Sequence, residues 1–314
     1  MLKFILVAFL VIGFLVFSIP ILIAEKSIGK TDPEKKGRQS LTIVRFMFRL
    51  ILKVAGIHIT VKGMENIPAD TPVLYVGNHR SYFDILVGYT TVPTPLGFMA
   101  KKEMESLPLL SNWMRNVNCL FLDRENIREG LRAILDGVEK VKNGISIWIF
   151  PEGTRNDAAD YLDLMPFKEG SLKIAEKAGC PVVPVAITGT AEAFESHYPR
   201  ITSSQVTIEF GEPFIIPARA PRGADTPKKQ GQTDSPGQEE PGRTGPGLSQ
   251  GETFRQASGS GGSGAGGVQT GAGADSLLRE IRCLTPEEKK FAGVYVRDVI
   301  LEMLLREKSL REGR

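Results

Sequence analysis

The sequence has few of the residues that build metal centres and disulfide frameworks. Its 314 residues include only three cysteines and three histidines. The cysteines lie far apart, without a C-x-x-C spacing, which argues against a zinc site or a disulfide framework and fits a reducing compartment. The residues concerned are Cys119, Cys180, Cys283, His58, His79 and His197.

Several catalytic and binding motifs are also absent. The chain contains no G-x-S-x-G nucleophile elbow and no G-x-x-x-x-G-K phosphate loop. Its formal net charge is only +3, which does not indicate a nucleic-acid partner. A protein nucleophile and a nucleotide-hydrolysing loop are therefore poorly supported.

A long uncharged run occupies the N-terminus. The stretch from Phe4 to Ala24 spans roughly 31 Å as a helix, close to the hydrocarbon core of a bilayer, which is about 30 Å thick. The run is too long for a signal peptide and lacks its cleavage pattern, so residues 1–25 are predicted to form a retained membrane anchor. Because basic residues follow the run, the rest of the chain is expected on the cytoplasmic side.

Residues 26–56 are predicted to form a basic linker and an amphipathic helix. Arg45, Arg49 and Lys53 recur every four residues among apolar side chains, so a helix gathers them on one stripe. We interpret this helix as lying on the membrane surface with its cations near anionic lipid, the alternative being a core helix with a basic stripe. Pro20 leaves open a re-entrant hairpin in place of a spanning anchor.

Residues 57–217 have the pattern of an α/β domain. Short apolar runs alternate with helical patterns, which predicts a single mixed, largely parallel sheet flanked by helices. Helices are indicated in "IREGLRAILDGVEKVKNG" and "FKEGSLKIAEKAGCP". The predicted strands are 57–61, 72–76, 96–100, 118–122, 145–150, 182–188 and 206–210.

The composition changes after this domain. Residues 218–276 are rich in Gly, Pro and Ser, which predicts a disordered insertion. Residues 277–314 are expected to form a C-terminal helix that packs on the α/β domain. Thr285, Pro286 and Glu288 provide its N-terminal capping pattern.

The stretch "VGNHRSYFD" places a histidine and an aspartate at the end of a predicted strand. One reading is structural, because Ser81 and Asp84 have the spacing of a helix capping box. The other is catalytic, because a carboxylate beside His79 would fix its tautomer and make it a general base. A five-residue separation points the two side chains apart in a continuous helix, so we expect His79 in the preceding loop and Asp84 in the first turn.

Two further strand ends carry charged residues. Asp123 and Arg124 follow the apolar run in "NCLFLDRENIREG", and Glu152 and Arg155 follow the apolar run in "IWIFPEGTRND". Each alone could be a solvated charge pair in a turn. Together with His79 they would lie at the edge where open α/β sheets bind ligands, and guanidinium groups suit a phosphate there.

These stretches resemble the glycerolipid acyltransferase family. "NHRSYFD", "FLDR", "FPEGTR" with the nearby "FKEG", and "VVPVAITG" follow the order and approximate spacing of its four sequence blocks. The likeness is greatest to 1-acyl-sn-glycerol-3-phosphate (lysophosphatidic acid) acyltransferases. It covers about residues 40 to 217 and the terminal helix, and the Gly-rich insertion departs from the family pattern.

The resemblance implies roles for particular residues. His79 and Asp84 would form the catalytic dyad. Substrate-binding roles would fall to residues of the other blocks and to one lysine between them. These residues are Arg124, Glu152, Gly153, Thr154, Arg155, Lys102 and, for the acyl donor, Pro184.

The activity implied is transfer of a fatty acyl group from a thioester to the sn-2 hydroxyl of lysophosphatidic acid, giving phosphatidic acid. The expected partners are membrane lipids, lysophosphatidic acid, and acyl-CoA or acyl-carrier protein as co-substrate, with no resident cofactor, metal or nucleic acid. The expected location is a bacterial inner membrane, with the catalytic domain cytoplasmic. Alternatives are another acceptor (glycerol 3-phosphate, another lysophospholipid or an aminolipid), a membrane-bound thioesterase, or a non-catalytic lipid-binding scaffold.

Overall fold

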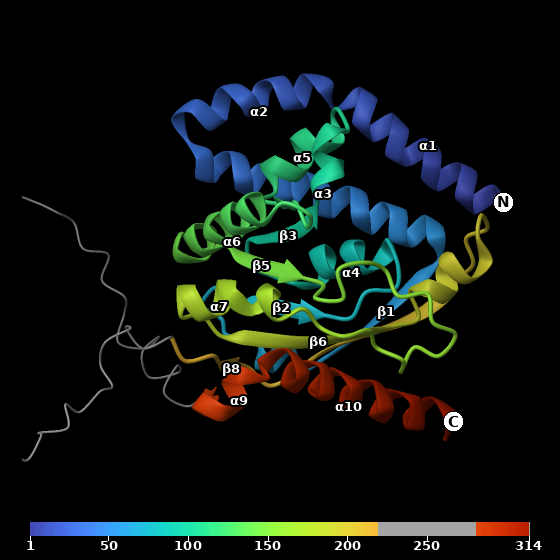
Figure 1. Cartoon of the computed structure of the whole chain (residues 1–314). Helices are drawn as coiled ribbons and strands as arrows, with labels where there is room; N and C mark the ends of the chain where they lie inside the picture. Colours follow the sequence, from blue (N-terminus) through green and yellow to red (C-terminus); the bar gives the residue numbers. More distant parts are fainter. Residues whose placement is uncertain (219–280, 314) are drawn as a thin grey trace, which may run out of the picture. The chain divides into compact units, whose positions relative to one another are not determined.

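The computed structural model describes residues 1–218 and 281–313, which belong to one structural unit built on a single mixed sheet (Figure 1). Along its main path the strand order is β1-β7-β6-β2-β5-β3-β4, and β8 pairs with β6 and β9. Only the β6–β7 and β6–β8 pairs are antiparallel, which confirms the predicted mixed, largely parallel sheet. The strands are β1 Ile57–Lys62, β2 Leu74–Gly77, β3 Leu96–Lys101, β4 Leu120–Leu122, β5 Ser146–Ile149, β6 Val182–Thr188, β7 Ser204–Phe210, β8 Phe214–Ile215 and β9 Arg282–Cys283.

Alternate side chains of the central strands pack into two separate cores. In β2, Tyr75 faces one core, whereas Leu74 and Val76 face the other, as the period of two in a strand requires. Trp148 of β5 stacks on Tyr75 at a centroid distance of 5.3 Å. Because both faces are covered, these strands have the continuous apolar sequence of a buried sheet, which is why they were predictable.

Helices cover the two faces of the sheet (Figure 1). The first core contains side chains of α3, α4 and α5, and α1 packs against it; the second contains side chains of α6, α7 and α10. The helices are α1 Leu2–Phe17, α2 Ile19–Thr31, α3 Pro33–Ala55, α4 Phe83–Thr91, α5 Leu110–Asn116, α6 Ile127–Lys142, α7 Lys173–Ala178, α9 Pro286–Lys290 and α10 Ala292–Glu312.

The N-terminal apolar run is two helices, which corrects the prediction of one continuous helix. α1 and α2 meet at Ser18 and are bent by 50° relative to each other. Ser18 accepts a hydrogen bond from Nε1 of Trp113 at 2.9 Å, and Pro20 lies in the first turn of α2, where a proline is tolerated. Among the described helices, none is long and apolar enough by itself to cross a membrane. The bent pair α1 and α2 together has sufficient length and apolar composition.

The basic stripe of α3 is only partly exposed. Arg45 turns inward and donates three hydrogen bonds of 2.5 to 2.9 Å to the carbonyl oxygens of Tyr89, Val92 and Thr94. The last carbonyl groups of a helix have no N–H partner within the helix, so the Arg45 guanidinium supplies the missing donors. Its positive charge also interacts favourably with the negative end of the α4 dipole. Arg45 was predicted among the lipid-facing cations and instead fixes α4 to α3.

The C-terminal segment also differs in detail from the prediction. Thr285 and Glu288 form the predicted capping box, but the helix they start ends at Lys290, and α10 begins after Phe291. β8 and β9 were not predicted, because each is only two residues long. The predicted disordered insertion at 218–276 lies almost entirely outside the described residues, which resume at residue 281.

Candidate active site

The site lies at the carboxyl ends of the parallel strands. β2 lies between β6 and β5, and it is parallel to both. The loops that leave these three strands therefore emerge side by side, and they carry His79, Glu152 and Thr190. The side-chain amide of Asn78 continues the pairing of β2 with β6 beyond the end of β2. Its Nδ2 donates to the Ile187 carbonyl at 2.9 Å, and its Oδ1 accepts the Ile187 N–H at 2.8 Å.

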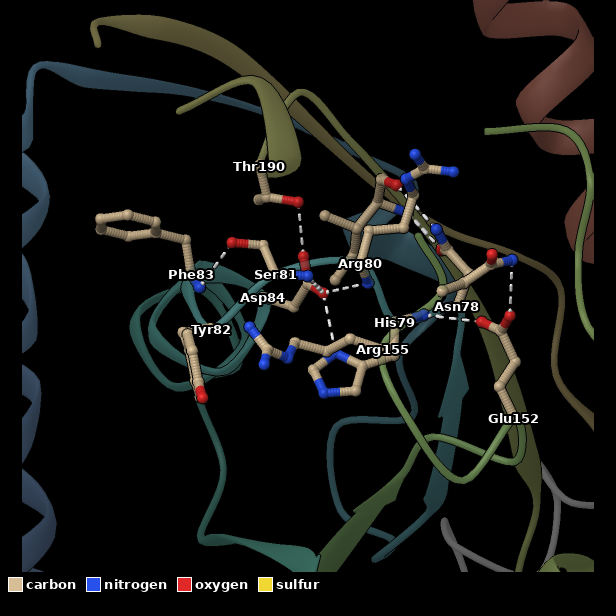
Figure 2. A network of polar contacts seen from close by, with 12 residues as sticks. Asn78, His79, Arg80, Ser81, Tyr82, Phe83, Asp84, Glu152, Arg155 and Thr190 are labelled. Atoms are coloured by element: carbon tan, nitrogen blue, oxygen red, sulfur yellow. Dashed lines mark hydrogen bonds and ion pairs between the residues drawn. The ribbon is translucent and has the colours of Figure 1, made fainter. Parts of the chain in front are cut away.

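His79 and Asp84 are in direct contact. Nδ1 of His79 lies 2.9 Å from Oδ2 of Asp84, and the aspartate is almost completely buried (Figure 2). With Nδ1 protonated toward the carboxylate, Nε2 keeps its lone pair. The His79 side chain is 14% exposed and Nε2 makes no hydrogen bond to the described residues, so it is free to accept a proton. His79 precedes α4 and Asp84 lies in its first turn, as predicted.

The Asp84 carboxylate is held by four donors. Oδ2 accepts the backbone N–H groups of Arg80 and Ser81, both at 2.8 Å, in addition to the His79 ring. Oδ1 accepts the hydroxyl of Thr190 at 2.6 Å. The Asp84 carboxylate thus accepts backbone N–H groups at the start of α4, as the structural interpretation expects, and also contacts the His79 ring, which is the geometry that the catalytic interpretation requires.

The backbone and the ring face of His79 are also fixed. The His79 N–H donates to Oε1 of Glu152 at 2.8 Å, and Oε2 of Glu152 accepts from Asn156 Nδ2 and Met165 N at 3.0 and 3.1 Å. The Asn156 N–H in turn donates to the His79 carbonyl at 2.7 Å. The imidazole stacks on Phe150 with a centroid distance of 4.0 Å and an interplanar angle of 10°.

Glu152 therefore contacts protein groups through both oxygens. It is only 3% exposed, and burial raises the pKa of its carboxyl above the usual range, although the hydrogen bonds from His79, Met165 and Asn156 oppose this. A carboxylate would repel a phosphate, whereas it can hold the His79 backbone. Its geometry fits the positioning of His79.

Two cations converge on Gly153. A Cβ atom at Gly153 would lie 2.9 Å from Nζ of Lys168 and 3.7 Å from Nη1 of Arg124, so these nitrogens are at most about 6.6 Å apart. Within the described part of the chain neither cation forms an ion pair. Burial lowers the pKa of the Arg124 guanidinium, and nearby Glu103 opposes this. Two unpaired cations this close repel one another, so an anion bound between them is favoured.

Arg155 is engaged differently. Its Nη1 lies 3.0 Å from Oε1 of Glu195. Its guanidinium stacks over the Tyr82 ring, 3.8 Å from the ring centroid, and Figure 2 shows these two side chains next to each other. The same oxygen of Glu195 accepts the Tyr82 N–H at 3.0 Å. Arg155 is thus already neutralised by an internal carboxylate.

Three other predicted residues form no hydrogen bond or ion pair with His79 or Asp84 in the described structure. Lys102 forms ion pairs with Glu105 at 2.8 Å and Glu129 at 4.0 Å, in a separate charged cluster. Pro184 is buried within β6, where its carbonyl accepts the N–H of Gly211, close to α10. Thr154 is exposed, and its side chain makes no hydrogen bond to the described residues.

Lys168 and Thr190 are among the site residues that were not identified from the sequence. Lys168 belongs to the quoted "FKEG", and its position beside the third block was the available signal. Thr190 follows the quoted "VVPVAITG" by one residue, and no spacing rule connects it to Asp84, which is 106 residues away. No group of three His, Cys, Asp or Glu side chains suited to a metal ion occurs among the residues the structure covers.

Comparison with known proteins identifies the family. A family model described as "Acyltransferase" matches residues 58–188, which carry all the predicted site residues. The crystal structure of the 1-acyl-sn-glycerophosphate (LPA) acyltransferase PlsC from Thermotoga maritima aligns with a TM-score of 0.56 and 30% identity, covering 68% of this chain and 83% of that one. The chain belongs to the acyltransferase family.

Curated relatives share a narrower description. The 1-acyl-sn-glycerol-3-phosphate acyltransferase of Borreliella burgdorferi is 34% identical over 50% of this chain and 62% of its own length. That of Saccharomyces cerevisiae is 31% identical over 52% of this chain and 54% of its own length. The chain thus spans about half to three fifths of these relatives.

Proposed function

We propose that the protein is a 1-acyl-sn-glycerol-3-phosphate acyltransferase that makes phosphatidic acid. The observation that carries this proposal is the His79–Asp84 contact, beside two cations, Arg124 and Lys168, that converge on Gly153. Among the residues that the structure covers, nothing hydrogen-bonds to Nε2 of His79 and no carboxylate pairs with either cation. The family and the names of the relatives support the same acceptor. His79, Asp84, Arg124 and Lys168 lie within residues 58–188, the range that the acyltransferase family model matches.

In the proposed reaction His79 acts as the general base. Nε2 removes the proton of the sn-2 hydroxyl, and the oxygen attacks the carbonyl carbon of an acyl thioester. The new C–O bond forms as the C–S bond breaks, and the leaving thiolate takes the proton from the imidazolium. Asp84 stabilises the imidazolium, and general-base assistance of this kind is worth about 10²- to 10⁴-fold.

The acceptor phosphate is assigned to Arg124 and Lys168. Gly153 has a φ of +83° and leaves room beside Lys168 that any side chain would fill. Binding of the phosphate at this point would also hold the glycerol hydroxyl near His79. The same contacts would therefore bind the acceptor and orient its reacting group. Arg155 and Thr154 are assigned to the rim of this site. The resemblance implies a position near the phosphate for Lys102 as well, and a role in binding the acyl donor for Pro184.

The N-terminal helices support membrane attachment. α1 exposes a row of large apolar side chains, including Phe9 at 71% and Phe17 at 80%. The bend at Ser18 favours the re-entrant arrangement over a straight span, with the site opening at the headgroup layer of the cytoplasmic leaflet. A bacterial inner membrane remains the proposed location, and acyl-CoA or acyl-carrier protein the proposed donor.

An acceptor panel tests the function. The full chain in phospholipid vesicles would be incubated with a labelled acyl thioester, on CoA or on acyl-carrier protein, and with lysophosphatidic acid, glycerol 3-phosphate, another lysophospholipid or no acceptor. Labelled phosphatidic acid from lysophosphatidic acid is the expected product. A preferred second acceptor would overturn the specificity, free fatty acid without acceptor would indicate a thioesterase, and no product would indicate a scaffold.

A further inference from the structure

The two oxygens of Asp84 are held in unequal ways. Oδ2 has three donors, namely the His79 ring and the N–H groups of Arg80 and Ser81. Oδ1 has one, the hydroxyl of Thr190 at 2.6 Å. Asp84 and Thr190 are each 1% exposed, so water cannot readily replace that single donor.

The Thr190 contact controls the orientation of the carboxylate. Rotation about the Cβ–Cγ bond moves both oxygens, so the Thr190 hydroxyl on Oδ1 acts together with the three donors on Oδ2 to fix the plane of the carboxylate. A hydroxyl-to-carboxylate distance of 2.6 Å lies in the range of strong charge-assisted hydrogen bonds. The angle at which Oδ2 faces Nδ1 of His79 therefore depends on Thr190.

The backbone holds Thr190 in place for this contact. It follows Gly189, whose φ of +88° turns the chain sharply at the end of β6. A Cβ at Gly189 would lie 2.1 Å from the carbonyl oxygen of Gln205, so only glycine permits this approach. The Gly189 carbonyl also accepts the Ser204 hydroxyl at 2.6 Å.

Thr188, two residues earlier, provides a contrast. Its hydroxyl accepts a hydrogen bond from Arg311 of α10 at 2.8 Å, and the residue is 5% exposed. The two threonines therefore share a residue type, a strand end and a buried environment. Only Thr190 contacts the dyad.

We propose that Thr190 is a positioning residue of the acyl transfer, acting through Asp84 on His79 without contacting either substrate. The inference rests on the proposed function. It predicts that the hydroxyl, and not the shape of the side chain, matters for turnover.

Three single variants test this prediction in the vesicle assay with lysophosphatidic acid. Thr190→Val keeps the shape and removes the hydroxyl; we expect kcat to fall about 10- to 100-fold while the acceptor KM changes less than twofold, because the binding cations are untouched. Thr190→Ser should recover kcat to within about threefold of wild type, since it keeps the donor. Thr188→Val, the matched control, should leave both constants unchanged.

A double variant separates positioning from general stability. On a His79→Ala background, Thr190→Val should cause no further loss of the residual rate, because Thr190 acts only through His79. Circular dichroism and thermal unfolding would verify folding, and Thr190→Ala carries the same test should the valine variant not fold. Wild-type kcat in the folded variant, a loss that serine does not recover, or an equal loss without His79 would overturn the inference. Full activity of His79→Ala would instead overturn the proposed mechanism.

Discussion

Arg155 lies 3.0 Å from Glu195, and this pair changes what the arginine can contribute to substrate binding. The second carboxylate oxygen of Glu195 is buried and has no hydrogen-bond partner among the described residues. A carboxylate in this position neutralises the guanidinium before any substrate arrives. Arg124 forms no ion pair with any residue that the structure describes, so the two arginines should differ in kinetic importance.

Substitution of the two arginines tests this difference. We expect Arg124→Ala to raise the acceptor KM by about 10-fold or more, as the loss of a charge-assisted hydrogen bond would. Arg155→Ala should raise it by only about threefold, in the range of a partly exposed ion pair. Steady-state kinetics with lysophosphatidic acid measure both, and a larger effect at Arg155 would contradict the geometry.

His79→Ala should nearly abolish turnover without unfolding the protein. The expected loss in kcat is at least about 10²-fold, because the base is removed while the binding residues stay in place. His58→Ala is the control, since His58 is an exposed residue of β1. Equal activity of the two variants would exclude His79 as the base.

Gly153→Ala should weaken acceptor binding more than its backbone strain alone predicts. Its φ of +83° makes any side chain unfavourable by about 1 kcal/mol, and the new Cβ would displace Lys168 as well. Gly144→Ala is a close control, because Gly144 has a φ of +84° and open space around it. Both variants should lose similar stability in thermal unfolding, and only Gly153→Ala should raise the acceptor KM.

Glu152→Gln should lower kcat and leave the acceptor KM nearly unchanged. The amide nitrogen would face the donors of Asn156 and Met165, so the loop that holds the His79 backbone would shift. The expected loss is about 10-fold, typical of a small misplacement of a catalytic group. A rise in KM with normal kcat would instead support a binding role for Glu152, as the family resemblance implied.

Glu307 should make stability depend on acid pH. Burial alone would raise its pKa, but hydrogen bonds from Lys62, Arg311 and Thr207 outweigh burial and lower the pKa from 4.5 to about 2. Because the pKa is lower in the folded state than in the unfolded state, ionised Glu307 adds to the free energy of unfolding above about pH 4.5. This contribution is lost as the pH falls toward 2. The contribution is about 2 kcal/mol, allowing for the partly exposed Lys62 and Arg311.

Urea unfolding between pH 7 and pH 3 measures this contribution. Glu307→Gln should be less stable than wild type at neutral pH, and the difference should shrink as the solution is acidified. Glu302→Gln, a change at an exposed position of the same helix, should match wild type at every pH. A constant difference across the range would show that the charge of Glu307 is not the cause.

The strands and the dyad were predictable because their signals are local. Seven apolar runs gave the seven longer strands, and the spacing within "NHRSYFD" placed His79 in a loop and Asp84 in a helix. The order of the strands was not predictable, since the pairing of β2 with β5 and β6 depends on packing between distant segments. For this reason Thr190 and the hydrogen bond from His79 to Glu152 emerged only from the fold.

The wrong predictions came from sequence patterns that indicate the polarity of a surface but do not show what that surface contacts. A stripe of arginines fits anionic lipid and helix carbonyls equally well, and Arg45 contacts carbonyls. An uncharged run indicates apolar surroundings and does not show where a helix bends, so the break at Ser18 was missed. Charge at a strand end likewise does not reveal that Arg155 is paired with Glu195.

The central place of β2 in the sheet also has a consequence for biosynthesis. His79 and Asp84 are translated early, yet Glu152, which holds the His79 backbone, and Thr190, which holds Asp84, follow strands β5 and β6 and are made much later. A nascent chain released from the ribosome before residue 190 would carry both members of the dyad without the hydroxyl that holds the aspartate. The set of contacts that holds His79 and Asp84 should therefore be completed late in synthesis.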